Sequence, residues 1–248
     1  MPPLRFFGNT KLINAGWERK EMKILEIEMF SDRLDETEAF YKDIVGLVLE
    51  DKSEEHLQFK AGFSSLRFKR SSSLNAVYHF AFNVPYNMLE EAYFWISSKW
   101  NLLPVQGDEK IADFEAWNAR AFYFYDNNGN IVEFIARKDL EALTEKPFTS
   151  GAVISLGEIG IVTDDVKKFT RRLTKLTGVE IFARQEPHSN FAALGNDEGL
   201  FIISETGRHW FPTERESQKF PCRVRFETGQ VLREITFNSE EIKRDRAD

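Results

Sequence analysis

The chain has 248 residues, which is enough for one large domain or two small ones. Hydrophobic residues make up 42% of it and charged residues 29%, and this excludes a disordered or coiled-coil protein. The 33 Lys and Arg residues against 40 Asp and Glu give a net charge of −7, which argues against a nucleic-acid-binding protein. Without a run of about 18 apolar residues, the sequence predicts no membrane-spanning segment. A single cysteine, Cys222, excludes an internal disulfide and a multi-cysteine metal site.

Residues 1–21 show neither strand alternation nor a helical stripe, and they lack the apolar core of a signal peptide. We therefore expect an N-terminal extension that the fold does not need, and a soluble, cytoplasmic protein.

From Met22 onward, one order of elements repeats along the chain. The segment 24–30 alternates like a strand, and 35–45 is a predicted helix with acidic residues in its first turn and Gly46 at its end. Three short strands are predicted to follow, at 47–50, 56–60 and 65–69. The sequence thus predicts a β-α-β-β-β module of about 50 residues.

The same order recurs after this first module. In the second module the predicted elements are a strand at 78–84, a helix at 89–100 and strands at 103–106, 120–125 and 131–136. An Asn- and Gly-rich turn at 126–130 joins the last two strands. A third module has predicted elements at 156–162, 166–176 and 200–204, and a fourth starts at 223–226 but runs out of chain.

A single module leaves one face of its sheet uncovered, so modules are expected to pair. Modules one and two would then form a first domain over 22–140. After a linker at 141–150, modules three and four would form an incomplete second domain over 151–248. The expected fold class is α+β, with paired βαβββ modules forming cupped mixed sheets.

Three segments carry a resemblance to a known family: LEIEMFSDRLDETEAFYKDIVGL, YHFAFNV and ARAFYFYDNNGNIVEFIAR. They resemble the vicinal oxygen chelate superfamily of glyoxalases, extradiol dioxygenases and metal-free bleomycin-resistance-type binding proteins. The match covers 22–140, and GEIGIVTDDVKKF extends it more weakly to 150–226. The resemblance implies two glyoxalase-like domains, the second truncated. It leaves the function open, because members share a scaffold and differ in chemistry.

The resemblance also implies a set of metal ligands. In metal-dependent members the ligands come from the first strand of each module and the last strand of a module. Those positions hold Glu26, where His is usual, together with His79 and Glu133. Arg67 stands where glyoxalases have a fourth ligand. The implied cofactor is a divalent ion: Zn, Mn, Fe(II) or Mg.

Strand alternation places candidate side chains on shared faces without reference to the family. Glu26 and Glu28 fall on one face of their strand, opposite an apolar face that we expect under the helix. Acidic groups inside a cup need a cation, which could be a metal or Arg67. A carboxylate cluster beside Arg67 would be satisfied without a metal. Glu158 begins module three, but since no matching His begins module four, we expect no second metal site.

Three functions remain in competition at this point. The first is a metal-dependent lyase, isomerase or dioxygenase for a small substrate with adjacent oxygens. Its general base would be Glu28, or Glu26 released from the metal, and Tyr123 would be a pocket wall or proton donor. The second is a metal-free protein that sequesters a small molecule between aromatic walls. The third is a scaffold, and the sequence leaves a homodimer open.

Overall fold

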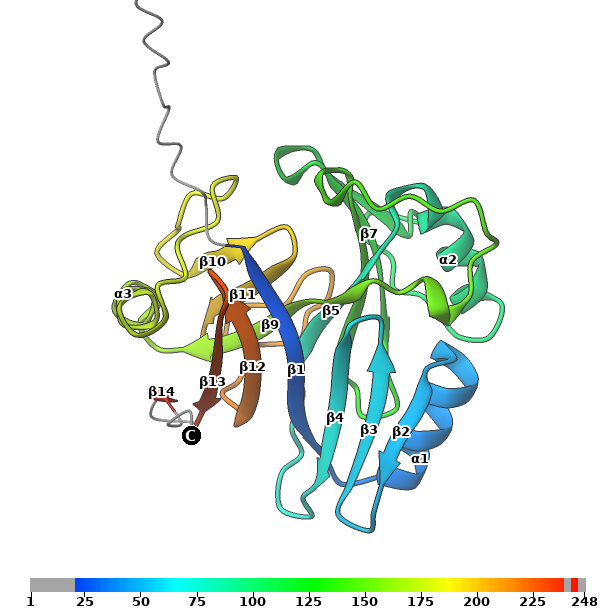
Figure 1. Cartoon of the computed structure of the whole chain (residues 1–248), viewed down its shortest axis with the longest axis horizontal. Coiled ribbons are helices and arrows are strands. Elements are labelled where there is room, and N and C mark those ends of the chain that lie inside the picture. The colour runs from blue at the N-terminus through cyan, green and yellow to red at the C-terminus, as the bar shows by residue number, and fades with distance from the viewer. Residues whose placement is uncertain (1–20, 239–241, 245–248) are drawn as a thin grey trace, which may run out of the picture.

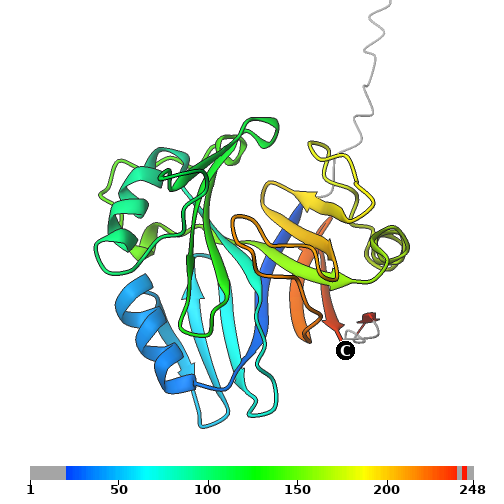
Figure 2. The same ribbon diagram turned by 180° about the vertical axis from the view of Figure 1, so that it is seen from behind.

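The computed structural model describes residues 21–238 and 242–244. A strongly curved mixed sheet runs through the molecule, with helices α1 and α2 along one outer side and α3 at the opposite end (Figure 1). The same arrangement is seen from behind, where α1 and α2 follow one another along that side (Figure 2). The predicted N-terminal extension lies outside the described residues except for Glu21. No helix of the described part has the length and apolar character needed to cross a membrane.

Module one follows the predicted order closely. Its strands are β1 (Met22–Ser31), β2 (Val48–Lys52), β3 (His56–Ala61) and β4 (Ser64–Arg70). The helix begins as α1 (Leu34–Ala39) and continues as a π-helical turn over Phe40–Val45. It stops at Gly46, whose φ of 87° is left-handed and suits glycine.

Module two repeats the pattern. It comprises β5 (His79–Val84), α2 (Leu89–Ser97), β6 (Ile111–Phe114), β7 (Ala119–Tyr125) and β8 (Ile131–Arg137). The prediction of a strand at 103–106 is wrong, because only Gln106 of that segment makes an isolated bridge and the strand forms at β6. Pro104 lacks an N–H for a ladder, and Gly107 adopts a φ of 56°, so the chain turns here instead.

Modules three and four are shorter. Module three comprises β9 (Ser155–Thr163), α3 (Val166–Thr177), β10 (Phe191–Asn196) and β11 (Gly199–Glu205). Module four consists of β12 (Cys222–Thr228), β13 (Val231–Phe237) and β14 (Ile242–Arg244), with no helix in its described residues. The structure confirms the α+β class and the paired modules.

The sheet shows which modules pair. In the order β14-β13-β12-β1-β9-β5-β8-β7-β6, β5 pairs antiparallel with β9, and β1 pairs antiparallel with β12. Module two therefore shares a curved sheet with module three, and module one with module four. The expectation that modules one and two share a cup is corrected. Strand alternation determines which face a side chain takes, but not which distant strand lies alongside.

The predicted linker at 141–150 thus joins two modules that share a sheet. As folding units, the predicted domains 22–140 and 151–248 stay a prediction.

The apolar core determines which faces of β5 and β8 point toward the helices and which point away. In β5, Phe80 and Phe82 are fully buried beneath the helical layer, and Phe82 meets Phe134 of β8 edge to face at 5.3 Å. The alternate residues of these strands point to the other face of the sheet. Functional side chains on that face are consequently held by a rigid, closely packed support.

Candidate metal centre

Three adjacent strands bring His79, Glu133 and Glu158 together. In the β-ladder, Ala81 of β5 stands opposite Glu133 of β8 on one side and opposite Glu158 of β9 on the other. Residues in register on neighbouring strands share a face, so both carboxylates point the same way as Ala81. His79 lies two residues before Ala81 and shares that face. Because Ala81 has only a methyl group, the longer side chains can meet above it.

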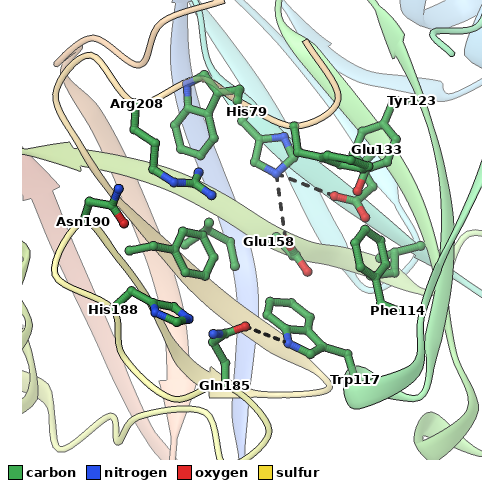
Figure 3. A pocket seen from close by; sticks show the side chains of 15 residues that line it. His79, Phe114, Trp117, Tyr123, Glu133, Glu158, Gln185, His188, Asn190 and Arg208 are labelled. Atoms are coloured by element: carbon green, nitrogen blue, oxygen red, sulfur yellow. Dashed lines mark hydrogen bonds and ion pairs between the residues drawn. The ribbon is translucent and has the colours of Figure 1, made fainter. Parts of the chain in front are cut away.

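These three side chains, called here the metal cluster, offer ligand atoms that all lie within 4.8 Å of one another. His79 Nε2 is 3.6 Å from Glu133 Oε2 and 3.9 Å from Glu158 Oε2 (Figure 3). His79 Nδ1 lies 3.2 Å from the carbonyl oxygen of Ile131. A carbonyl only accepts, so Nδ1 carries the proton and Nε2 presents a lone pair to the two carboxylates.

Burial controls the ionisation of the cluster, because all three residues are at most 6% exposed. Burial lowers the pKa of His79 to about 4, so its imidazole is neutral at pH 7 and its contacts with the carboxylates are not ion pairs. Burial, with the neighbouring Glu158 charge, raises the pKa of Glu133 well above its ordinary value. Burial also raises the pKa of Glu158, to about 6, against the opposing effect of Arg137.

Arg137 and Tyr123 support the two carboxylates from the side. The Arg137 guanidinium, which is completely buried, donates to Glu158 Oε1 and lies 3.7 Å from Asp197 Oδ1. Tyr123 makes a side-chain hydrogen bond with Glu133 that lowers the pKa of the carboxyl. Burial and the Glu133 charge raise the pKa of Tyr123, so its hydroxyl stays protonated and is the donor.

The metal cluster opens into a cavity of about 370 Å³. Aromatic rings form much of its wall, and Arg208, Gln185, His188 and Asn190 bring polar groups to it from module three and the loop before β12 (Figure 3). Its aromatic lining residues are Phe114, Trp117, Tyr123, Phe191, Trp210 and Phe211. A cavity of this size suits a small organic molecule.

The structure brings two of the three sequence-predicted ligands together, His79 and Glu133. The third member of the cluster is Glu158, and the structure does not bring Glu26 of the predicted trio to this point. The reason is the pairing of β5 with β9 in place of β1. The one sequence feature that pointed to Glu158 was its position in the first strand of module three, where modules one and two have their candidate ligands.

Glu26 and Glu28 lie on a different surface, where arginines neutralise them. Arg223 Nη2 is 3.1 Å from Glu26 Oε1 and 3.0 Å from Glu28 Oε2. Arg67 Nε is 3.2 Å from Glu28 Oε2, so Arg67 is one of the cations that balance these acids, which was the metal-free alternative. Glu28, predicted as a general base, does not line the cavity, whereas Tyr123 does line it.

The register also identifies the position that matches Glu133 in module three. In module two, Ile131 stands opposite His79, and Glu133 follows two residues later. In module three, Leu200 stands opposite Glu158, so the residue that corresponds to Glu133 is Ile202. Ile202 lines the cavity and has no ligand atom. An ion on the cluster would therefore have three protein ligands from this set and coordination positions open to the cavity.

Comparison with solved structures agrees with this architecture. A candidate dioxygenase from Bacillus subtilis subsp. subtilis str. 168 matches with a TM-score of 0.56 and 16% identity, covering 88% of this chain and 86% of that one. Glyoxalase I from Zea mays matches with a TM-score of 0.51 and 16% identity, covering 84% and 75%. The chain has the vicinal oxygen chelate fold. No protein-family model and no curated protein sequence matches it.

Proposed function

We propose that this protein is an enzyme that uses one divalent metal ion, held by His79, Glu133 and Glu158, to act on a small substrate with two adjacent oxygens. The observation that carries the proposal is the meeting of three lone-pair-bearing atoms, Nε2 and two Oε2, at a buried point. Such atoms repel one another unless a proton or a cation lies between them.

The side chains present fit a metal ion. A neutral imidazole whose other nitrogen donates to a backbone carbonyl is the usual form of a histidine ligand. Two carboxylates with one imidazole suit Mn, Fe(II), Zn or Mg. When bound, such an ion supplies Lewis-acid polarisation of the substrate oxygens.

The protein's own groups provide binding, exclusion of water and a proton. The aromatic walls accommodate an apolar substrate body and limit solvent around the cluster. Tyr123 holds its one hydroxyl hydrogen beside Glu133, at the edge of the cavity, and can redirect it from Glu133 to a substrate oxygen when substrate binds. Arg137 stabilises the ionised form of Glu158, which a metal ligand must have.

A metal-free binding protein is the second candidate. The observation in its favour is that Arg137 already pairs with Glu158, while burial favours a protonated Glu133. The cluster could in this way be neutral without a metal, and the aromatic walls would hold a sequestered molecule.

Metal analysis separates the two candidates. Protein purified without a polyhistidine tag from metal-supplemented medium should contain about one Mn, Fe or Zn per chain, and titration of the metal-free form should show one saturable site. Glu133→Gln should weaken binding of that ion at least about 100-fold, because a carboxylate ligand is lost. The matched control is Glu26→Gln, which removes a similarly buried carboxylate beside Arg223 and should change affinity less than about twofold.

Equal effects of the two substitutions, or no bound metal in any variant, would favour the metal-free binding protein.

A further inference from the structure

Arg208 stands on a firmly held turn at the edge of the cavity. Its backbone N–H donates to the carbonyl of Glu205 at 3.1 Å, and its own carbonyl accepts from Ser217 N at 2.8 Å. Gly207 N donates to the carbonyl of Ser217 at 2.9 Å, so the two arms of the loop that connects β11 to β12 pair antiparallel over a short stretch. The direction of the Arg208 side chain is thus set by a fixed backbone.

The guanidinium of Arg208 points into the cavity and lies over an aromatic ring (Figure 3). Its Cζ is 4.7 Å from the centroid of Phe191, and Nη1 donates to the carbonyl of His209 at 3.3 Å. Most of its donors remain available, because an arginine has five N–H groups.

Within the described chain, Arg208 has no carboxylate partner, unlike the other two arginines near the site. Arg137 pairs with Glu158 and Asp197, and Arg184 pairs with Asp139 and Asp197. Burial lowers the pKa of Arg208, and no acidic neighbour opposes that effect. A half-buried cation without a counter-ion is costly, and a bound anion would remove that cost.

The acids of the metal cluster do not serve as that counter-ion. Arg208 makes no ion pair with Glu133 or Glu158, and a divalent ion on the cluster would balance both carboxylates. The cavity with its metal would then carry the uncompensated charge of Arg208. Beside Arg208, the half-buried Asn190 makes no side-chain hydrogen bond among the described residues, so its amide can add a donor.

We propose that Arg208, assisted by Asn190, binds a carboxylate group of the substrate. This inference rests on the proposed function, in which the two adjacent oxygens at the other end of the substrate bind the metal ion. The substrate class is then a small carboxylate with an apolar body and two adjacent oxygens. A single guanidinium next to a neutral amide matches the planar, singly charged carboxylate better than a phosphate, for which several cations are usual.

Pairs of compounds that differ only in this charge test the inference. We would titrate metal-loaded protein calorimetrically with 3,4-dihydroxybenzoate and with 3,4-dihydroxybenzamide, and metal-free protein with benzoate and benzamide. In at least one pair the carboxylate should bind about tenfold more tightly than the amide. Arg208→Gln should reduce that preference to less than about twofold, and Arg208→Lys should keep part of it.

Arg215→Gln is the matched control, because Arg215 lies on the same loop but does not line the cavity. It removes the same charge and should leave the preference unchanged. The inference is overturned if acid and amide bind equally in both pairs, or if Arg215→Gln reduces the preference as much as Arg208→Gln.

The metal-free arm separates this inference from the proposed function. If no metal binds and the benzoate preference still depends on Arg208, the enzyme proposal fails while the carboxylate site stands. If metal binds to His79, Glu133 and Glu158 but no preference is found, the carboxylate site fails alone.

Discussion

Two faces of this molecule are built from the same kind of module but surround their acidic side chains differently. On the face made by β1, β4 and β12, Glu26 and Glu28 each meet a guanidinium within 3.2 Å. In the metal cluster, Glu158 also meets a guanidinium, that of Arg137, but Glu133 has no such partner, and both carboxylates turn an oxygen toward the lone pair of His79. Arginines neutralise the carboxylates of the first face, whereas under the proposed function the second face takes a metal ion. The difference shows that an acidic residue at an alternating position of a strand indicates a metal site only when its neighbours on the adjacent strands are known.

The largest expected contrast concerns the arginines of the two surfaces. Arg137→Met should destabilise the metal-free protein by about 3–5 kcal/mol above pH 7, because it leaves Glu158 buried without its partner. Arg223→Met should cost less than about 1 kcal/mol, because the Arg223 side chain is 30% exposed. Urea unfolding of both variants measures this, and equal losses would contradict the contrast.

The pH dependence of stability gives a smaller effect. The pKa of Glu158 is about 6 in the folded protein against an ordinary 4.5, so the folded state holds this proton more tightly. The contribution is fully present below pH 4.5 and is lost as pH rises through 6. From pH 4.5 to 7.5, metal-free Glu158→Gln should therefore gain about 2 kcal/mol relative to the wild type. Glu26→Gln serves as the reference on the other surface.

Thermal or urea unfolding at several pH values would show this gain. A difference between wild type and Glu158→Gln that does not change with pH would mean that Glu158 is not held in its neutral form by burial.

The smallest of the three effects concerns Tyr123. Tyr123→Phe removes the hydrogen bond that favours ionised Glu133, so the pKa of Glu133 should rise further and metal binding should weaken up to about tenfold at pH 7. Calorimetric titration with Mn(II) at pH 7 and pH 9 checks this. The loss should shrink at the higher pH, because a larger share of Glu133 is then ionised in both proteins. A loss that is the same at both pH values would assign Tyr123 a purely steric role.

The sequence was sufficient for the modules and for part of the site. Alternation and turn residues located β5, β7 and β8, and they placed His79 and Glu133 on the face opposite Phe80 and Phe82. The assignment of Glu26 to the cluster failed because it depended on which module lies beside module two. That choice depends on contacts between strands that are far apart in the chain, here β5 with β9, and no local pattern encodes them.

The same limit applies to the cations. Arg137 follows directly from the end of a predicted strand, yet its pairing with Glu158 appears only when β8 and β9 flank β5. Arg208 lies in a loop without periodicity, so the sequence offers no signal that it faces the cavity.

A crystal structure of the protein grown with Mn(II), with anomalous scattering data, tests the central claim most directly. The account predicts one strong anomalous peak with His79 Nε2 and one oxygen each of Glu133 and Glu158 about 2.0–2.3 Å away. An anomalous peak between Glu26 and Glu28 would contradict it. So would the absence of a peak at His79, Glu133 and Glu158 in crystals saturated with Mn(II).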